Sequence, residues 1–329
     1  MLSRRSFVAI TVWLLLSATG LFAFDIGGIE YISVSQYARI FGLKFKTLER
    51  GKKMSAFNKY TNIVFELNSR VAKVNGYYVN LGHPVAVKKG MLLVSKRDAY
   101  KNLAPVLFPH QLPAPRRPFH IVIDAGHGGK DIGAQNKRYG VAEKRVNLDI
   151  ALRLGAALRK LGYKVSYTRT TDVFIDLENR PIIANKRAAD LFISVHSNSA
   201  ENKSVRGVET YALTPVWLPS SSSAKLRKAD TVAYPGNNVD GWSQSLSFNI
   251  QKSLVDSLDA DDRGARRARF AVLRTANMPA CLVEVGFLSN NAECLNLAKA
   301  EYRQRVANAI ARGVAKYAAI VKANLPARR

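Results

Sequence analysis

The sequence has little cysteine, little histidine and few acidic residues. Its 329 residues include two cysteines, so no framework of disulfides holds the fold together, although one Cys281–Cys294 bridge stays open. We favour a buried free thiol for Cys281, which lies in the apolar run ACLVEVGF. The apolar fraction of 47% excludes a largely disordered chain and predicts one or two ordinary globular domains.

The shortage of acidic residues leaves a net charge of +26, spread along the chain. Residues 24–117 hold 16 basic and 5 acidic residues, and residues 118–329 hold 32 and 19. An even spread argues against a dedicated patch for nucleic acid, so we expect no nucleic-acid partner. Anionic envelope polymers and a membrane surface are the candidate partners for this charge. The alternative is a general basic bias of the protein that serves no partner.

One long apolar run lies at the N-terminus. FVAITVWLLLSATGLFA follows Arg4 and Arg5 and ends in small residues at Ala23, which predicts a secretory signal peptide over residues 1–23. The run is short for a membrane span, which needs about 20 apolar residues, but an uncleaved anchor stays open. We therefore expect export to the periplasm or cell envelope, and the paired arginines of SRRSF leave a twin-arginine route open.

Residues 24–108 show short strands and turns without a cluster of acids, histidines or cysteines. VNGYYVN alternates around an Asn-Gly pair, which predicts a β-hairpin. The segments YISVSQYARIFGLKFK and KVNGYYVNLGHPVAVKKGMLLVSKRDAYKNL resemble the small stalk domain first described at the N-terminus of copper amine oxidases, which implies a binding or spacer domain and no copper site. A proline-rich linker, residues 109–118, predicts the domain boundary.

From Phe119 the pattern alternates between apolar strands and amphipathic helices. The strands are expected at HIVIDAG, YKVSYTR, LFISVHSN, GVETYAL, FAVLR and PACLVEVGF. We expect residues 119–323 to form an α/β three-layer sandwich, with a mostly parallel or mixed sheet flanked by helices. A small α+β or β-rich domain precedes it.

Three of these strands end near a candidate ligand or acid. His127 follows IVIDAG, His196 ends LFISVH, and Glu284 lies near the end of CLVEV. Strands that point the same way in one sheet bring such ends to one edge, where α/β folds bind ligands. The other three histidines, His83, His110 and His120, lie in a turn, the linker and a strand start, and we expect structural roles for them.

The glycines around His127 suggest either a phosphate loop or a metal site. GHGGKD lacks the spacing of both common phosphate-binding loops, which disfavours the phosphate. A metal site needs a third ligand, and Glu143 at the start of the next helix is the best candidate, although a helix-start acid with no ligand role is the alternative. Two histidines and a glutamate are a known catalytic zinc set with a fourth position open. Gly126, Gly128 and Gly129 would then let the chain turn and keep side chains away from the metal.

Residues 119–320 resemble the zinc-dependent N-acetylmuramoyl-L-alanine amidases of bacterial cell walls. The resemblance lies in IDAGHGGKDIGA, EKRVNLDIALRL, LRKLGYKVSYTRTTD, LENRPIIANKRAADLFISVHSNSA, RGVETYAL, RFAVLR and PACLVEVGFLSN, which occur in the family's order. It implies that His127, Glu143 and His196 bind one Zn²⁺ and that Glu284 is the acid–base catalyst. Glu284 would take a proton from the attacking water and return it to the leaving amine.

The resemblance also implies the substrate, which is peptidoglycan. The bond cut would be the amide between N-acetylmuramic acid and the L-alanine of the stem peptide. A zinc peptidase that cuts within the stem peptide is the alternative enzyme, and a wall-binding or activator protein with the same fold is the non-catalytic alternative. We expect a monomer, and whether an activator protein is needed stays open.

Three further segments have two interpretations each. Asn198 either contacts substrate or serves a strand-end turn. The arginines of DDRGARRARFAVLR belong to a family-like segment, and a solvated basic face is the interpretation we favour for most of them. The long loop at residues 214–242 departs from the family, and it either shapes access to the cleft or is a plain surface loop.

Overall fold

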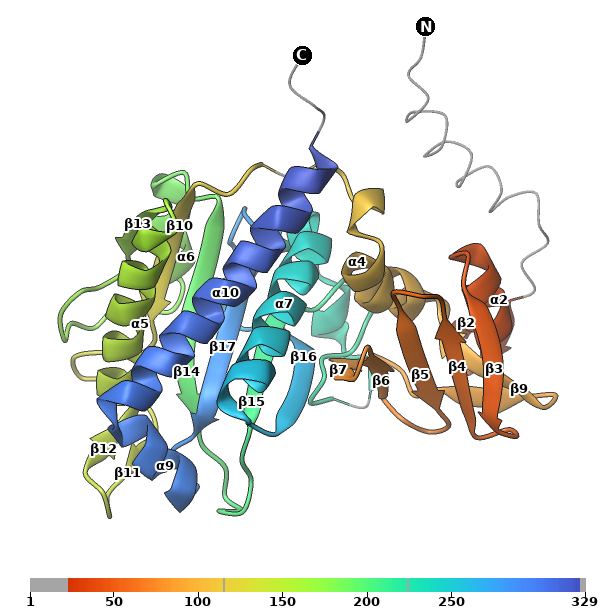
Figure 1. Ribbon diagram of the computed structural model, residues 1–329, viewed down its shortest axis with the longest axis horizontal. Coiled ribbons are helices and arrows are strands. Elements are labelled where there is room, and N and C mark those ends of the chain that lie inside the picture. The colour runs from red at the N-terminus through yellow and green to blue at the C-terminus, as the bar shows by residue number, and fades with distance from the viewer. Residues whose placement is uncertain (1–22, 115, 224, 326–329) are drawn as a thin grey trace, which may run out of the picture.

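The computed structural model describes residues 23–114, 116–223 and 225–325. An eleven-stranded sheet runs through this part of the chain in the order β13-β10-β14-β17-β15-β16-β7-β6-β5-β4-β3 (Figure 1). A four-stranded sheet, β1-β2-β9-β8, and a small β11-β12 pair complete the strands among these residues. The predicted signal peptide, residues 1–23, falls outside the described residues apart from its last position.

The first part of the chain is β-rich, as expected. Its hairpin at VNGYYVN is present, with Asn75 and Gly76 both at positive φ between β6 and β7. Its strands are β1 Phe24–Ile26, β2 Ile29–Ser33, β3 Lys44–Glu49, β4 Lys53–Phe57, β5 Asn62–Glu66, β6 Val71–Val74, β7 Tyr77–Asn80, β8 Ala86–Lys88 and β9 Met91–Ser95. Its helices are α2 Val34–Ile40, α3 Lys96–Asp98, a π-helical turn at Ala99–Leu103, and α4 Ala104–Leu107. The linker begins with a 3₁₀ turn at Pro109–Gln111.

The second part is the expected mixed sheet with helices on both faces. Its strands are β10 His120–Ala125, β11 Gln135–Asn136, β12 Val141–Ala142, β13 Lys164–Tyr167, β14 Leu191–Asn198, β15 Val208–Leu213, β16 Asp262–Ala268 and β17 Ala280–Phe287. Its helices are α5 Glu143–Lys160, α6 Asn179–Lys186, α7 Asp240–Leu258, α8 Ala271–Arg274, α9 Asn291–Ala298 and α10 Ala300–Asn324, with 3₁₀ turns at Lys228–Thr231 and Pro235–Val239. Strands β13, β10, β14 and β17 run parallel, whereas β15 runs antiparallel to β17.

One predicted strand is wrong. FAVLR does not form a strand; most of it is the short helix α8, and the neighbouring strand β16 comes earlier, at DRGARRA. Strand β16 pairs with β15 on one side and with β7 on the other, and these pairings hold its charged residues in the sheet. A strand of this composition has no apolar pattern by which the sequence would reveal it.

The two faces of the sheet have separate apolar cores. Helices α5, α7 and α10 cover one face and bury residues such as Ile123, Ile193 and Val283 (Figure 1). Helices α6 and α8 cover part of the other face around Phe192 and Leu282. His196 and Glu284 lie near the carboxyl ends of β14 and β17.

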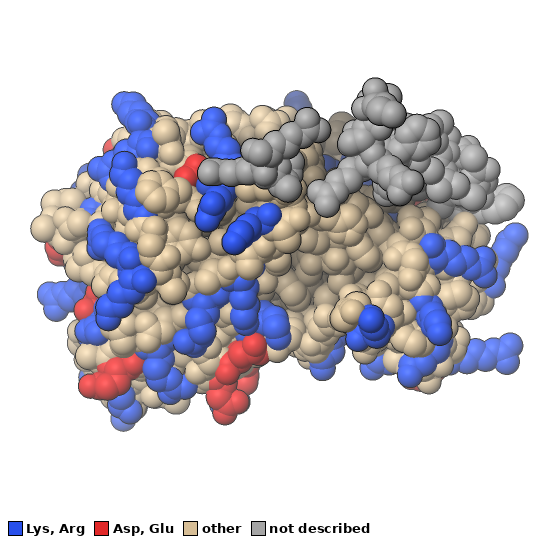
Figure 2. All heavy atoms as spheres, turned by 45° about the horizontal axis from the view of Figure 1, so that its top comes forward, with Lys and Arg blue, Asp and Glu red and all other residues tan. Residues whose placement is uncertain are grey.

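The surface is basic on both parts of the chain. Figure 2 shows lysine and arginine side chains spread over the visible face, with few acidic ones among them. Among the described residues, no helix combines the length and the apolar character that a membrane crossing requires. Both cysteines are buried and free.

Candidate metal centre

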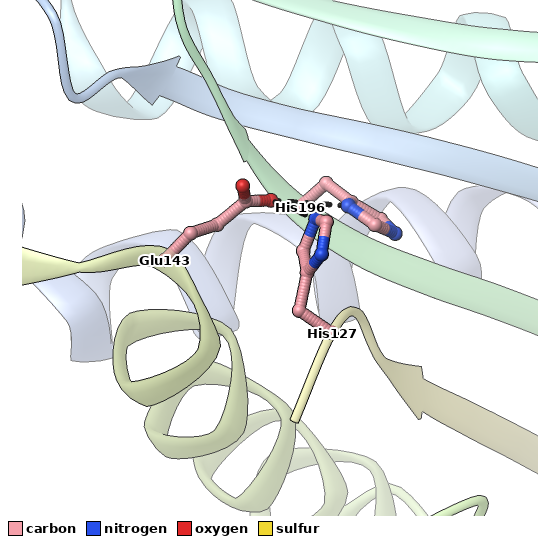
Figure 3. A group of neighbouring side chains, drawn as sticks. All are labelled: His127, Glu143 and His196. Carbon is pink, nitrogen blue, oxygen red and sulfur yellow. Dashed lines mark hydrogen bonds and ion pairs between the residues drawn. The ribbon is translucent and has the colours of Figure 1, made fainter. Parts of the chain in front are cut away.

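Three predicted ligands meet at the carboxyl edge of the parallel strands. His127 lies in the loop after β10, Glu143 is the first residue of α5, and His196 is near the end of β14 (Figure 3). Their ligand atoms all lie within 4.8 Å of one another. Glu143 Oε1 is 3.2 Å from His127 Nε2 and 3.0 Å from His196 Nδ1. The structure therefore brings together residues that are far apart in the sequence.

The donor set and its spacing fit Zn²⁺. Zinc bonds of about 2.0–2.2 Å in tetrahedral geometry separate neighbouring ligand atoms by about 3.3–3.5 Å, close to the distances between Glu143 and the two histidines. Two imidazoles and one carboxylate are also the ligand types of catalytic zinc sites. Zinc ligands of this kind are held by outer hydrogen bonds, and His127 has such a partner: its Nδ1 lies 2.8 Å from Asp131 Oδ2.

Glu143 is fixed by hydrogen bonds from the surrounding chain. Its Oε2 accepts from Ala134 N at 2.7 Å, and its Oε1 accepts from Ser197 N and Asn147 Nδ2, each at 3.1 Å. Burial alone would raise the pKa of Glu143, but its hydrogen bonds with His127 and His196 leave that pKa well below the usual range. A lowered pKa favours the carboxylate form, which a metal ligand requires.

The backbone around His127 is held in an unusual conformation. His127 has a φ of 61°, in the left-handed region, where a non-glycine residue needs support from its surroundings. Arg180 supplies part of it, since its guanidinium donates to the carbonyls of Ala125 and His127 at 2.8 and 3.0 Å. Arg180 also forms a fully buried ion pair with Asp124 at 2.9 Å. Arg169 donates to the carbonyls of Ala125 and Gly126 at 2.9 and 3.0 Å.

Two glycines leave room for the ligands. A Cβ on Gly126 would lie 2.3 Å from Cε1 of the His196 ring, so only glycine permits this packing. A Cβ on Gly133 would lie 2.6 Å from Glu143 Oε2, and Gly133 also has a φ of 69°. The expectation that glycine keeps side chains away from the ligands thus holds for Gly126. Gly128 and Gly129 instead lie against Val173 and Phe174.

Glu284 lies next to His196, one of the three candidate ligands, in the sheet. Its Cα pairs with that of His196 on β14, and on the other side with that of Glu209 on β15. Its Oε2 is buried and has no hydrogen-bond partner among the described residues. Burial raises the pKa of Glu284 well above its usual range, and the charges of Glu143 and Glu209 raise it further. Such a carboxyl group is suited to holding and releasing a proton.

The arginines of β16 and its surroundings do not form a solvated basic face. Arg263 and Arg266 bind the buried Glu209, at 2.9 and 2.6 Å. Arg267 is fully buried, and Arg269 binds the buried Asp230. The interpretation favoured from the sequence is wrong for Arg267 and Arg269, which are enclosed by partners 27 or more positions away in the chain. Arg263 and Arg266 pair with Glu209 but stay partly exposed.

Asn198 and the loop at residues 214–242 are the other two segments for which the sequence left two interpretations. Asn198 donates to Glu209 Oε1 at 2.8 Å, so it belongs to the polar network beside Glu284. The loop after β15 starts at the sheet edge opposite His196, because β15 runs antiparallel to β17. Arg269 holds this loop through Asp230, and Arg70 holds it through the carbonyls of Ser220 and Ser223 at 3.2 and 2.7 Å.

Comparison with known proteins identifies the family. The sequence profile described as N-acetylmuramoyl-L-alanine amidase matches residues 121–316, more than half of the chain. The chain belongs to this amidase family. The match covers both strands and helices of the second part of the chain, so residues 121–316 are an amidase domain with the mixed sheet at its centre.

Individual relatives agree with this assignment. The amidase domain is similar to the N-acetylmuramoyl-L-alanine amidase AmiC of Neisseria meningitidis, with 36% identity over 61% of this chain and 53% of that protein. It is 34% identical to AmiA of Escherichia coli, over 60% of this chain and 75% of AmiA. The alignment thus spans about half of AmiC and three quarters of AmiA.

Solved structures give the same result. An N-acetylmuramoyl-L-alanine amidase from Clostridium difficile matches with a TM-score of 0.52 and 32% identity, over 61% of this chain and 97% of that one. AmiC2 of Nostoc punctiforme matches with a TM-score of 0.51 and 34% identity, over 60% of this chain and 96% of that one. These matches support the mixed α/β fold of the amidase domain and leave the first part of the chain outside the comparison.

Sequence reasoning missed several residues around the site. Asp131 lies four positions after His127, a spacing that suggests a carboxylate partner for the second imidazole nitrogen. Glu209 is an acid inside the apolar strand GVETYAL, which is a sign of a buried network. Arg169 and Arg180 have no such local sign, because their partner atoms are mostly backbone carbonyls. Asp124 has none either, because the side chains that donate to it lie 44 or more positions away.

Proposed function

We propose that this protein cleaves peptidoglycan at the amide between N-acetylmuramic acid and the L-alanine of the stem peptide, with one Zn²⁺ held by His127, Glu143 and His196. The observation that carries the proposal is the meeting of these ligands beside Glu284. The spacing of the donor atoms and the bond from His127 to Asp131 support zinc as the metal.

Within this proposal, His127, Glu143 and His196 would hold Zn²⁺, which would act as a Lewis acid toward the scissile carbonyl and would make water at the site more acidic. Glu284 takes the proton of the attacking water, holds it on its buried carboxyl group, and delivers it to the nitrogen of the leaving alanine. Asp131 fixes the tautomer and orientation of His127. Arg169 and Arg180 hold the His127 loop in its left-handed conformation.

We also propose a cellular location, a role for the first part of the chain and a class of partners. The predicted signal peptide and the cell-wall substrate support export to the periplasm or envelope. Residues 24–108 are proposed as an envelope-associated stalk domain, with the boundary in the linker at 109–118. A CwlD amidase from Clostridioides difficile, 30% identical to this chain, has been solved in complex with the GerS lipoprotein. We therefore propose testing envelope proteins as partners, together with anionic polymers.

Digestion of purified peptidoglycan tests the reaction. We expect intact stem peptides with a free alanine amine among the products, identified by mass spectrometry. Glu284→Gln should abolish product formation and retain the metal, while the control Glu301→Gln, at an exposed position of α10, should retain activity. Fragments from within the stem peptide would contradict the amidase assignment, and an active Glu284→Gln would contradict the role of Glu284.

A further inference from the structure

A polar network lies on the side of Glu284 away from the candidate ligands. Its centre is Glu209, a buried residue of β15 whose Cα pairs with that of Glu284. Glu209 Oε1 accepts from Asn198 Nδ2 at 2.8 Å and from the Tyr211 hydroxyl at 2.7 Å. Glu209 Oε2 accepts from Arg263 Nε at 2.9 Å and from Arg266 Nη1 at 2.6 Å. All four acceptor directions of this carboxylate are thus used by the protein.

The two arginines keep donors for a further anion. Among the described residues, Arg263 hydrogen-bonds only through Nε and Arg266 only through Nη1. Arg266 Nε is buried and has no partner there. The two side chains are 31% and 18% exposed, so solute reaches them. Two guanidinium groups against one carboxylate leave the network with a net positive charge.

Aromatic rings hold the guanidinium groups in place. The Arg263 guanidinium lies 4.9 Å from the centre of the Phe287 ring, and that of Arg266 lies 5.5 Å from the Tyr211 ring. A guanidinium fixed by stacking and by one ion pair loses little freedom when it binds a second carboxylate. The arrangement has the features of an anion-binding subsite.

The order of the strands places this subsite on the side of Glu284 that is away from the candidate ligands. Across the sheet, the ligands come from the β10 and β14 side, Glu284 from β17, Glu209 from β15 and the arginines from β16. In the proposed function, on which this inference rests, Glu284 protonates the leaving amine. The leaving stem peptide then extends from Glu284 toward β15 and β16.

The distance from β17 to β16 agrees with a contact between the arginines and one of the first residues of the stem peptide. Adjacent strands lie about 4.8 Å apart, so β16 is about 10 Å from β17. Two extended residues span at most about 7 Å, and the arginine side chains cover the remainder. We propose that Arg263 and Arg266 bind a free carboxylate on the residue that follows the L-alanine, and so select stem peptides that carry this charge.

The test compares two N-acetylmuramoyl peptides that differ only at this carboxylate, present as the free acid in one and as a primary amide in the other. Unaltered protein should cleave the acid with a kcat/KM roughly tenfold higher, as expected for a charge-assisted hydrogen bond. Arg263→Met should remove most of this preference, and Arg263→Lys should restore part of it. Arg305→Met, an exposed arginine of α10, should leave the preference unchanged.

Equal cleavage of the two peptides by the unaltered protein would overturn the subsite while the amidase activity stands. A preference that survives in Arg263→Met and Arg266→Met would also overturn it. Cleavage of neither peptide by a protein that also fails to release stem peptides from peptidoglycan would overturn the proposed function together with this inference. The comparison on unaltered protein does not depend on the folding of any variant.

Discussion

Asp131 shows how single residues outside the candidate ligand set shape the candidate metal centre. Its carboxylate faces His127 Nδ1 and leaves Nε2 directed at Glu143 and the proposed metal position. Burial lowers the pKa of His127, but hydrogen bonds to Glu143 and Asp131 outweigh burial and raise it overall. The contact with Asp131 also favours a proton on Nδ1, which leaves Nε2 as the nitrogen available to a metal.

Asp131→Ala should weaken metal binding by roughly 10- to 100-fold, because the ring of His127 loses its outer partner. A competition titration of zinc against a chromophoric chelator measures this affinity. Glu201→Ala removes a charge at an exposed position and serves as the control. An affinity equal to that of the unaltered protein would show that Asp131 does not support the ligand.

At the scale of elements, the sequence predicts those helices, strands and turns that a local residue pattern determines. The Asn-Gly hairpin, the long helices α5, α7 and α10, and the parallel strands β10, β14 and β17 all follow from periodicity and turn residues. The same patterns place His127, Glu143, His196 and Glu284 at element ends. Their meeting in space agrees with the expectation, while their roles in binding and catalysis stay predictions.

Other elements depend on contacts that no local pattern contains. Strand β16 carries the charges of DRGARRA and lies between β15 and β7, two strands from distant segments. Two of its arginines, Arg263 and Arg266, pair with Glu209, at least 54 positions away. Helix α8 takes over the apolar FAVLR segment that resembled a strand. Long-range pairing thus outweighs local propensity here.

At the scale of the whole molecule, the two parts of the chain share one sheet. β7 pairs with β16 through Val79 and Ala265, and Phe248 of α7 packs in the apolar core of the first part. Arg267 lies fully buried at the contact and donates to Asn102 Oδ1 at 2.9 Å and to the carbonyls of Leu213 and Asp240 at 2.9 and 3.0 Å. Burial lowers the pKa of Arg267 to about 10.

Arg267→Met should lower the free energy of unfolding by about 3 kcal/mol, because several buried acceptors on both parts lose a charged donor. Chemical denaturation followed by circular dichroism measures the change. Arg305→Met removes an exposed arginine and should have little effect. Unchanged stability of Arg267→Met would mean that the contact between the parts does not depend on this residue.

The zinc content of the folded protein tests the central claim most directly. Native mass spectrometry of the unaltered chain should find one Zn²⁺, and His110→Ala, an exposed linker histidine, should retain it. His196→Ala should lose the zinc, and hydrolysis of peptidoglycan by the unaltered chain should stop with a chelator and return when zinc is added. Full zinc content in His196→Ala, or hydrolysis that continues after the metal is removed, would contradict the account.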